Sequence, residues 1–270
     1  MNRGPIGIFD SGIGGLTVAR AIYDLLPHES TVYLGDTARV PYGPKSPATV
    51  RRYSAEILAW LERQDVKAVV VACNTATAHA LPDLQAASPV PVLGVVAPGA
   101  RAAAGATRSG SVGVIGTAGT IASGAYRNAL LTERPDLAVV EQACPLFVPL
   151  VEEGWFSHPA ARAIAEVYLQ PITAAGVDAL VLGCTHYPLL KPLLADLLGS
   201  GVALIDSAEE TARDLAGLLQ RRGLSAPSDA VATHRWGATD DVERFARLGA
   251  LFTGRPVAPV ELVDLEATAS

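Results

Sequence analysis

Residues 67–77 have the sequence KAVVVACNTAT, and residues 178–188 have the sequence DALVLGCTHYP. Each stretch is a short apolar run that ends in a cysteine, Cys73 or Cys184, followed by hydroxyl or amide residues that can cap a helix. We therefore expect each thiol at the carboxyl end of a buried parallel strand, where open α/β sheets bind ligands. A helix N-terminus at that point also stabilises a thiolate. The matching stretches predict two thiols that face each other across one substrate.

The composition is typical of an α/β protein. The chain has 270 residues, of which 50% are hydrophobic and 6% aromatic, and its mean hydropathy is +0.30. An excess of Ala, Val and Leu fits parallel strands covered by helices on both faces. The net charge of -6, without a basic patch, argues against nucleic acid as the primary ligand.

Other simple features restrict the expected cellular location and the kinds of disulfide or metal site. No apolar run reaches about 18 residues, so we expect no membrane span. The first predicted strand starts within a few residues of Met1, so we expect no signal peptide. Three cysteines without a CxxC pair predict neither a disulfide framework nor a metal site. A reducing, cytoplasmic location fits best.

Strands and helices alternate along the chain, which predicts α/β architecture with right-handed crossovers. In the first half we expect strands at 6–9, 31–34 and 67–72, a glycine-rich loop at 10–15, and helices at 16–26 and 47–63. A second copy of this plan begins near residue 96, with a strand at 112–115 and a loop at 116–120. Similar spacing from loop to cysteine in both halves indicates duplication. The alternative is that regular βα units merely resemble one another.

We therefore predict two pseudo-symmetric parallel-sheet domains with the active site in the cleft between them. The tail from about residue 205 exceeds what the second repeat needs. In it we expect a helix at 207–220, a polar loop, a helix near 240–247 and a final strand. We assign residues 1–95 and 206–270 to the N-terminal domain, and residues 96–205 to an inserted second domain.

Four acid–base side chains fall in loops near the predicted strand ends. Ionising an ordinary thiol at pH 7 costs about 2 kcal/mol, so a catalytic thiolate needs help from its surroundings. The candidates are Asp10, Asp36, Glu152 and His186. Helix capping by Asp10, a loop hydrogen bond from His186 and a solvated helix face at Glu152 remain open alternatives. Glu152 is informative only through the resemblance described below. Cys144 lacks the strand, cysteine and cap pattern, and we interpret it as structural.

Neutral polar residues also gather at the strand ends, and no cofactor motif accompanies them. Backbone N–H groups and hydroxyls in this setting suit carboxylates, although helix capping alone would explain each residue. The residues are Ser11, Asn74, Thr75, Thr117, Thr120 and Thr185. The loop at 10–15 is not GxGxxG, and no Walker A pattern exists. A pyridoxal phosphate enzyme needs a lysine, and Lys45, Lys67 and Lys191 all lie outside the cysteine loops. A metal at Cys184 and His186 would need ligands from distant loops.

Five motifs together resemble the glutamate racemases of bacterial cell-wall synthesis. They are DSGIGG at 10–15, PYG at 41–43, ACNTA at 72–76, GTAGT at 116–120 and LGCTHYP at 182–188. The resemblance runs from residue 6 to about 210 with every motif in order. The related aspartate racemases share the two-cysteine plan but typically carry Glu, rather than His, after the second Cys-Thr.

The resemblance implies a cofactor-independent racemase that interconverts L- and D-glutamate and supplies D-glutamate for peptidoglycan synthesis. It implies that Cys73 exchanges the proton on the D side and Cys184 on the L side. Asp10 and His186 would assist them, with Asp36 and Glu152 as supporting acids. The implied substrate contacts are Asp10, Ser11, Tyr42, Gly43, Asn74, Thr75, Thr117, Thr120, Thr185 and His186.

Partners and regulation follow as further expectations. We expect glutamate as the small-molecule substrate, no nucleic acid or membrane partner, and a homodimer. Some members of the family carry an N-terminal extension linked to activation by a peptidoglycan precursor. This chain begins almost at its first predicted strand, so we do not expect that regulation.

Two other functions remain open from the residues alone. A binding protein for an acidic metabolite would carry the cysteines incidentally and would not exchange the Cα proton of glutamate with solvent. A related one-thiol enzyme, such as a decarboxylase, would use a single cysteine, and the matched pair counts against it. Inversion at Cα favours two thiols, because one base cannot reach both faces without turning the substrate.

Overall fold

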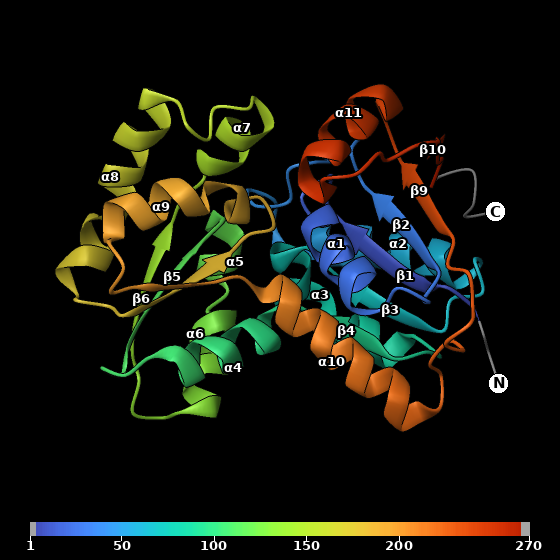
Figure 1. The fold of residues 1–270 in the computed structure, drawn as a ribbon, viewed down its shortest axis with the longest axis horizontal. Coiled ribbons are helices and arrows are strands. Elements are labelled where there is room, and N and C mark those ends of the chain that lie inside the picture. The colour runs from blue at the N-terminus through green and yellow to red at the C-terminus, as the bar shows by residue number, and fades with distance from the viewer. Residues whose placement is uncertain (1–3, 266–270) are drawn as a thin grey trace.

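Two parallel β-sheets form the framework of the computed structural model, which describes residues 4–265 (Figure 1). The first sheet has the order β10-β9-β2-β1-β3-β4, and the second has the order β6-β5-β7-β8. The strands of the first sheet are β1 (Ile6–Asp10), β2 (Thr31–Gly35), β3 (Ala68–Val71), β4 (Val92–Gly94), β9 (His234–Ala238) and β10 (Val260–Leu262). Those of the second are β5 (Ser111–Gly116), β6 (Ala138–Ala143), β7 (Ala179–Gly183) and β8 (Ala203–Ile205).

Helices cover both faces of each sheet. The first sheet packs α1 (Leu16–Leu25), α10 (Ser207–Arg222) and α11 (Val242–Thr253) on one face, and α2 (Pro47–Glu62) and α3 (Asn74–Ala87) on the other. The second sheet packs α8 (Pro159–Ala174) and α9 (Lys191–Leu198) on one face, and α4 (Val96–Ala106) and α6 (Ala125–Glu133) on the other. The shorter helices are α5 (Ala118–Ala122), α7 (Phe147–Glu152) and the 3₁₀ helix η1 (Tyr187–Leu190). Within residues 4–265, no helix has the length and apolarity needed to cross a bilayer.

The strand order confirms the predicted repeat. Across the first sheet, the first four strands of the chain lie side by side in the order β2-β1-β3-β4. The four strands of the second sheet lie in the equivalent order, β6-β5-β7-β8. Every pairing within these two sets is parallel. The predicted fold class, two pseudo-symmetric parallel-sheet domains, is therefore correct. The apolar run of each cysteine stretch forms the third strand of its half; Cys184 directly follows β7, and Cys73 lies two residues after the end of β3.

Local signals explain why the helices begin where they do. Ser46 Oγ accepts a hydrogen bond from Thr49 N at 3.3 Å, and Pro47 occupies the first turn of α2. Asp206 caps α10 in the same way, with Oδ1 accepting from Ala208 N at 3.1 Å. These caps are readable in the sequence because they involve residues two or three positions apart.

The tail contains one strand that the sequence analysis missed. Residues 234–238 form β9 within the segment that we interpreted as a polar loop, and that interpretation is wrong. The strand HRWGA lacks an apolar run, yet it pairs with β2 on one side and β10 on the other. Helix α11 also extends to Thr253, beyond the predicted end at 247. A strand position fixed by pairing with a distant neighbour leaves little trace in local sequence.

Sheet membership supports the domain bounds that we propose. Strands β9 and β10 extend the first sheet, so the tail returns to the N-terminal half. The chain crosses between the sheets twice, from β4 to α4 and from β8 to α10 (Figure 1). We therefore propose residues 1–95 with 206–270 as one domain and 96–205 as the other; residues 1–3 and 266–270 lie outside the described residues.

A buried ion pair ties the segment after α10 to the first sheet. Lys67 Nζ lies 2.5 Å from Glu29 Oε2, and the two side chains are 2% and 4% exposed. Lys67 Nζ also donates to Leu224 O at 2.7 Å, and Ala226 N donates to Glu29 Oε1 at 2.7 Å. Both charges are thus paired and hydrogen-bonded, as burial requires.

Removing one partner of this pair should destabilise the fold strongly. We expect Lys67→Met to lower the free energy of unfolding by about 3–5 kcal/mol, because it leaves the Glu29 carboxylate buried and uncompensated. Urea denaturation followed by circular dichroism measures this. The matched control is Arg235→Met, which removes an exposed ion pair with Glu261 and should cost less than about 1 kcal/mol. Equal losses in both variants would contradict the assigned role of the buried pair.

Candidate active site

The first thiol lies at the carboxyl edge of the first sheet, beside Asp10 and Ser11. Cys73 caps α3, with Sγ accepting from Ala76 N at 3.4 Å, and its thiol donates to Ser11 Oγ at 3.6 Å. Asp10 ends β1, and its Oδ2 accepts from Gly12 N at 2.9 Å. Asp10 Oδ1 is buried and has no hydrogen-bond partner within the described part of the chain. An unpartnered buried carboxyl oxygen next to a thiol suits a group that exchanges protons or binds a ligand cation.

Burial governs the protonation of this pair. Burial, reinforced by the negative charge of Asp10, raises the pKa of the Cys73 thiol to about 12. Burial also raises the pKa of Asp10, although the charge of His186 and backbone N–H groups act in the opposite direction. At neutral pH Cys73 is therefore a thiol rather than a thiolate when the site is empty.

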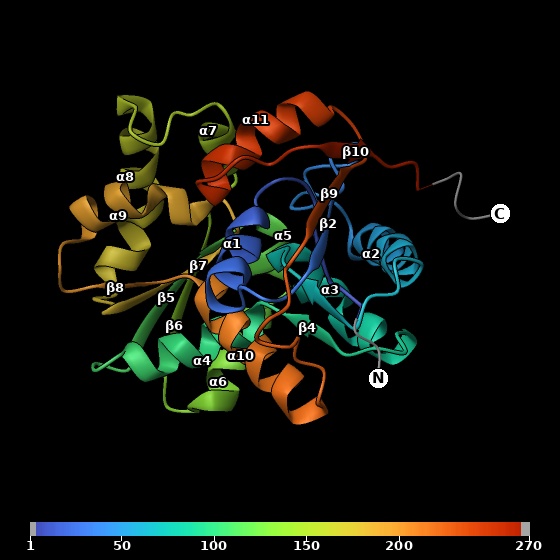
Figure 2. The ribbon, with the colours of Figure 1, turned by 45° about the vertical axis from the view of Figure 1, so that its right-hand side comes forward.

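The second thiol lies in a chain of charged groups. Cys184 follows β7, and its Sγ lies 3.9 Å from His186 Nδ1. His186 Nε2 lies 3.0 Å from Glu152 Oε1 on α7. Arg244 Nη2 on α11 donates to Glu152 Oε2 at 3.2 Å. Glu152 therefore links the second cysteine loop to the C-terminal tail, where α11 reaches over to α7 (Figure 2).

This chain of groups keeps His186 protonated. Burial lowers the pKa of His186, but its contacts with Cys184 and Glu152 outweigh that effect and raise it to about 10. Burial raises the pKa of Glu152, and the hydrogen bond from His186 with the charge of Arg244 brings it below its usual value. An imidazolium beside a cysteine sulfur stabilises the thiolate. The two thiols thus have unequal surroundings: Cys73 is held protonated, whereas Cys184 faces a cation.

The predicted substrate contacts meet where the two halves touch. Thr75 Oγ1 lies 2.8 Å from Thr117 Oγ1 and 3.2 Å from Thr120 Oγ1. Gly119 N donates to Gly43 O at 2.9 Å. Thr75 and Gly43 belong to the first half, and the other three residues belong to the second. The first cysteine loop is thereby joined to the loop that follows β5 in the second half.

Asp36 accepts hydrogen bonds that hold the loop after β2 in place. Its Oδ2 accepts from Arg39 Nε at 2.8 Å and from the Tyr42 hydroxyl, and its Oδ1 accepts from Thr239 Oγ1 at 3.0 Å. Asp36 and Tyr42 are almost fully buried. The geometry makes Asp36 a positioning residue that holds Tyr42 and Gly43 against the second half, rather than a group in contact with either sulfur.

Three residues with contacts in the site were missed by the sequence analysis. A Cβ on Gly14 would lie 2.3 Å from Thr185 Oγ1 and 2.4 Å from His186 Nδ1, so the first loop fits against the second cysteine loop only without a side chain. Arg244 contacts Glu152, and the Tyr126 hydroxyl donates to Asn74 Oδ1 at 2.6 Å. The glycine-rich loop could have pointed to Gly14, but an Arg on an amphipathic helix and a lone Tyr carry no such signal.

Cys144 differs from Cys73 in its surroundings. It directly follows β6. No helix begins at this cysteine, and its thiol donates to Gln142 O at 3.6 Å. Its carbonyl accepts from the Tyr187 hydroxyl at 2.8 Å. Complete burial raises the pKa of the Cys144 thiol well above its usual value, which fits a structural thiol.

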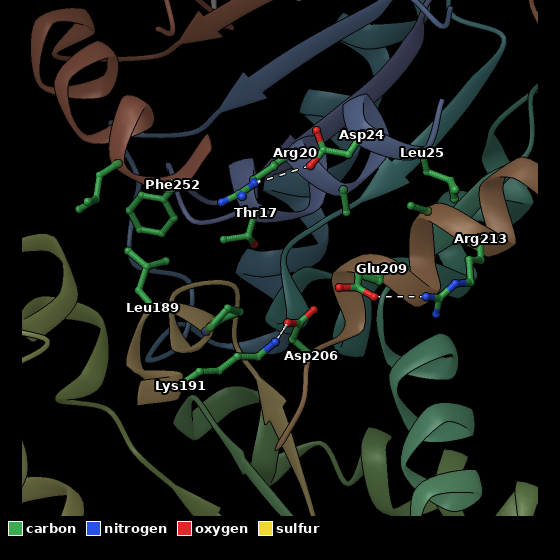
Figure 3. A pocket seen from close by; sticks show the side chains of 14 residues that line it. Thr17, Arg20, Asp24, Leu25, Leu189, Lys191, Asp206, Glu209, Arg213 and Phe252 are labelled. Carbon is green, nitrogen blue, oxygen red and sulfur yellow. Dashed lines mark hydrogen bonds and ion pairs between the residues drawn. The ribbon is translucent and has the colours of Figure 1, made fainter. Parts of the chain in front are cut away.

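Three cavities adjoin this arrangement, and one of about 130 Å³ has Gly12, Glu152 and Arg244 among its lining residues. One of about 320 Å³ lies between the two halves, and Gly43, Thr117 and Glu152 are among its lining residues. Another of about 530 Å³ lies between α1, η1, α10 and α11, and contains none of the predicted site residues (Figure 3). Its charged side chains pair with one another, as Arg20 does with Asp24. It touches the site through Phe252, whose ring packs edge-on against His186 with centroids 5.3 Å apart. The two cavities lined by Glu152, and not the cavity of about 530 Å³, therefore lie beside the candidate site.

Comparisons with known proteins give a consistent result. The model of the Asp/Glu/hydantoin racemase family matches residues 16–215. A glutamate racemase of Geobacter metallireducens is 54% identical over 262 residues, covering 97% of this chain and 97% of that protein. A solved glutamate racemase isoform from Bacillus anthracis has 42% identity and a TM-score of 0.94, covering 98% and 99% of the two chains. The glutamate racemase of Francisella tularensis, solved in complex with D-glutamate, has 36% identity and a TM-score of 0.92 over 99% and 100%.

Proposed function

We propose that this chain, which belongs to the Asp/Glu/hydantoin racemase family, interconverts L-glutamate and D-glutamate. The observation that carries the proposal is the pair of buried thiols at matched strand ends, Cys73 and Cys184, each with its own acid–base neighbour. The relatives that this chain matches over nearly its whole length are glutamate racemases, and one of them binds D-glutamate in its solved structure. His186, two residues after Cys184, is the residue type that the resemblance associates with glutamate rather than aspartate.

Inversion proceeds in two proton transfers in this proposal. Cys184, as a thiolate beside the His186 imidazolium, takes the Cα proton of L-glutamate onto its sulfur. Cys73, held as a thiol by its burial, donates its proton to the opposite face of Cα and becomes the thiolate. The product is D-glutamate, and the reverse reaction starts from the exchanged protonation states. No proton is gained or lost overall.

The other groups have supporting roles. Asp10 assists Cys73, and Glu152 fixes the orientation and charge of His186, as the third group of a catalytic triad does for its base. Hydroxyl, amide and backbone N–H groups would bind the carboxylates and stabilise the carbanion in a water-poor cleft. The proposed contacts are Asp10, Ser11, Tyr42, Gly43, Asn74, Thr75, Thr117, Thr120, Thr185 and His186. Asp36 acts through Tyr42.

The biological setting is proposed on the same basis. D-glutamate for peptidoglycan synthesis, a cytoplasmic location and a homodimeric assembly remain predictions. Independence from cofactors is also a prediction, since two thiols and their neighbours supply both an acid and a base. The proposed chemistry does not depend on any of these predictions.

Exchange of the Cα proton with solvent tests the proposal directly. Dialysed, chelator-treated protein is incubated with each enantiomer of glutamate in D₂O. We expect optical activity to decay to zero and deuterium to appear at Cα, without added pyridoxal phosphate or metal. Absence of deuterium would favour a binding protein for an acidic metabolite. Activity that returns only with a cofactor would overturn the two-thiol mechanism.

The close fit at Gly14 predicts a loss of activity when a methyl group is added. Gly14→Ala should lower kcat/KM for glutamate at least about tenfold, because the methyl group displaces Thr185 and His186 from the sulfur of Cys184. The matched control is Gly105→Ala on α4, where an added Cβ meets nothing within 4 Å. Polarimetry measures activity, and circular dichroism verifies folding. Equal activity of the two variants would contradict the assigned role of Gly14.

The support that Glu152 gives His186 predicts a shifted pH profile. Glu152→Gln removes a negative charge whose contact raises the pKa of His186, so the imidazolium should lose its proton at a lower pH than in the wild type. The alkaline limb of the kcat/KM profile should therefore move to lower pH. Other charges near this pair are Arg244 and Asp10, and both remain in the variant. An unchanged alkaline limb would show that His186 protonation does not control the reaction.

A further inference from the structure

The hydroxyl of Tyr126 contacts the site from the second half of the molecule. Tyr126 lies on α6 and is fully buried. Its hydroxyl donates to Asn74 Oδ1 at 2.6 Å, and Asn74 is the first residue of α3, directly after Cys73. This single hydrogen bond therefore joins the second domain to a residue beside a catalytic sulfur. The mechanism above does not use it.

The Tyr126 hydroxyl lies close to both segments in which the chain crosses from one domain to the other. Gly99 belongs to α4, the first element after one crossing, and an added Cβ there would lie 3.4 Å from Tyr126 Oη and 3.1 Å from Ser207 Cβ. Ser207 starts α10, the first element after the other crossing. Gly99 thus lies next to both Ser207 and Tyr126. The hydroxyl thus lies where α3, α4, α6 and α10 converge.

The proton on this hydroxyl determines which way the Asn74 amide points. Burial raises the pKa of Tyr126 above its ordinary value, so the hydroxyl stays protonated at neutral pH. A donor at 2.6 Å selects the oxygen end of the amide. The NH₂ end then points the other way, and it has no protein acceptor within residues 4–265. A free amide donor next to Cys73 is suited to a carboxylate oxygen, whereas a flipped amide would oppose it with a second acceptor.

We propose that Tyr126 is a positioning residue for glutamate: its hydroxyl holds the Asn74 amide with the NH₂ group toward a substrate carboxylate, and so ties that contact to the hinge between the domains. The inference rests on the proposed function, because it takes glutamate as the ligand of Asn74. Tyr126 itself does not touch the substrate. Its effect passes entirely through Asn74, which gives the inference a sharp test.

A double-mutant cycle separates this role from a merely structural one. Tyr126→Phe removes one hydroxyl and should raise KM for both glutamate enantiomers about tenfold, since the amide is then free to turn. In the Asn74→Ala background, the same change should alter KM less than about twofold. The matched control is Tyr23→Phe, because Tyr23 is also buried and its hydroxyl accepts from Trp236 Nε1 at 3.2 Å, within the first domain. It should change KM little in either background.

Each outcome decides the question. Loss of the Tyr126 effect in the Asn74→Ala background supports the inference. An equal effect in both backgrounds shows that the hydroxyl acts elsewhere and overturns it. Calorimetric titration of the same proteins with D-glutamate repeats the cycle without turnover. If wild-type protein binds D-glutamate but does not racemise it, the proposed function fails while the cycle in Kd still tests Tyr126.

Discussion

Replacing Cys73 or Cys184 by serine is expected to lower racemisation of glutamate by about 10³-fold or more, with the fold retained. A serine hydroxyl is far too weak an acid to form the required base, and general acid–base groups typically contribute about 10²- to 10⁴-fold. Serine has nearly the same shape as cysteine, so capping of α3 and packing after β7 should persist. Polarimetry with each enantiomer measures the loss, and circular dichroism measures the fold.

Cys144→Ser is the matched control for these two variants. Cys144 is as buried as the other two cysteines, and its thiol only donates to Gln142 O. It should therefore keep near-normal turnover. Near-normal turnover in Cys73→Ser or Cys184→Ser would instead rule out the two-base mechanism.

Opposite stereochemical preferences of the two serine variants are the second large effect that we expect. The enantiomers have equal free energy, so any variant must have equal kcat/KM in both directions of racemisation. Racemisation rates therefore cannot assign the two faces, and a half-reaction is needed. Elimination from a glutamate analogue with a good β-leaving group needs only one proton abstraction, for which one thiolate suffices.

The assignment of faces gives a definite result for each variant. Cys184→Ser retains Cys73 and should eliminate mainly from the D enantiomer, whereas Cys73→Ser retains Cys184 and should eliminate mainly from the L enantiomer. Product release from each enantiomer is measured with each variant. The same preference in both variants would overturn the facing-thiol geometry. If Cys184→Ser instead preferred the L enantiomer and Cys73→Ser the D enantiomer, the two-base mechanism would stand. The assignment of each cysteine to a face of Cα, which comes from the resemblance, would then be reversed.

In the proposed mechanism, the different surroundings of the two thiols decide which cysteine acts first as the acid and which as the base. Burial and Asp10 keep Cys73 protonated, and the His186 imidazolium lies 3.9 Å from the sulfur of Cys184. The asymmetry arises from neighbours that differ between the repeats: Asp10 from the first loop, and Glu152 with Arg244 around His186. The duplicated framework thus carries two different acid–base environments.

Local sequence was sufficient for the framework of the site. The apolar runs before Cys73 and Cys184, the glycine-rich loop at 10–15 and the polar residues after each strand all predicted where parallel strands end. They succeeded because strand runs, turns and caps depend on residues within a few positions of one another. The fold class and the repeat followed from their order, and the structure confirms both. The choice of glutamate came from the motifs as a resemblance and not from physical chemistry.

By itself, then, the sequence predicted the strand–cysteine–helix unit at Cys73 and the duplicated α/β plan. Only the tertiary structure decided that β9 forms beside β2, that Arg244 pairs with a Glu152 92 positions away, and that the Tyr126 hydroxyl donates to Asn74. It also decided that Asp36 accepts a hydrogen bond from Tyr42. The reason is the range of the interactions: a cap or a buried run is encoded within one segment, whereas these contacts exist only once distant segments have packed.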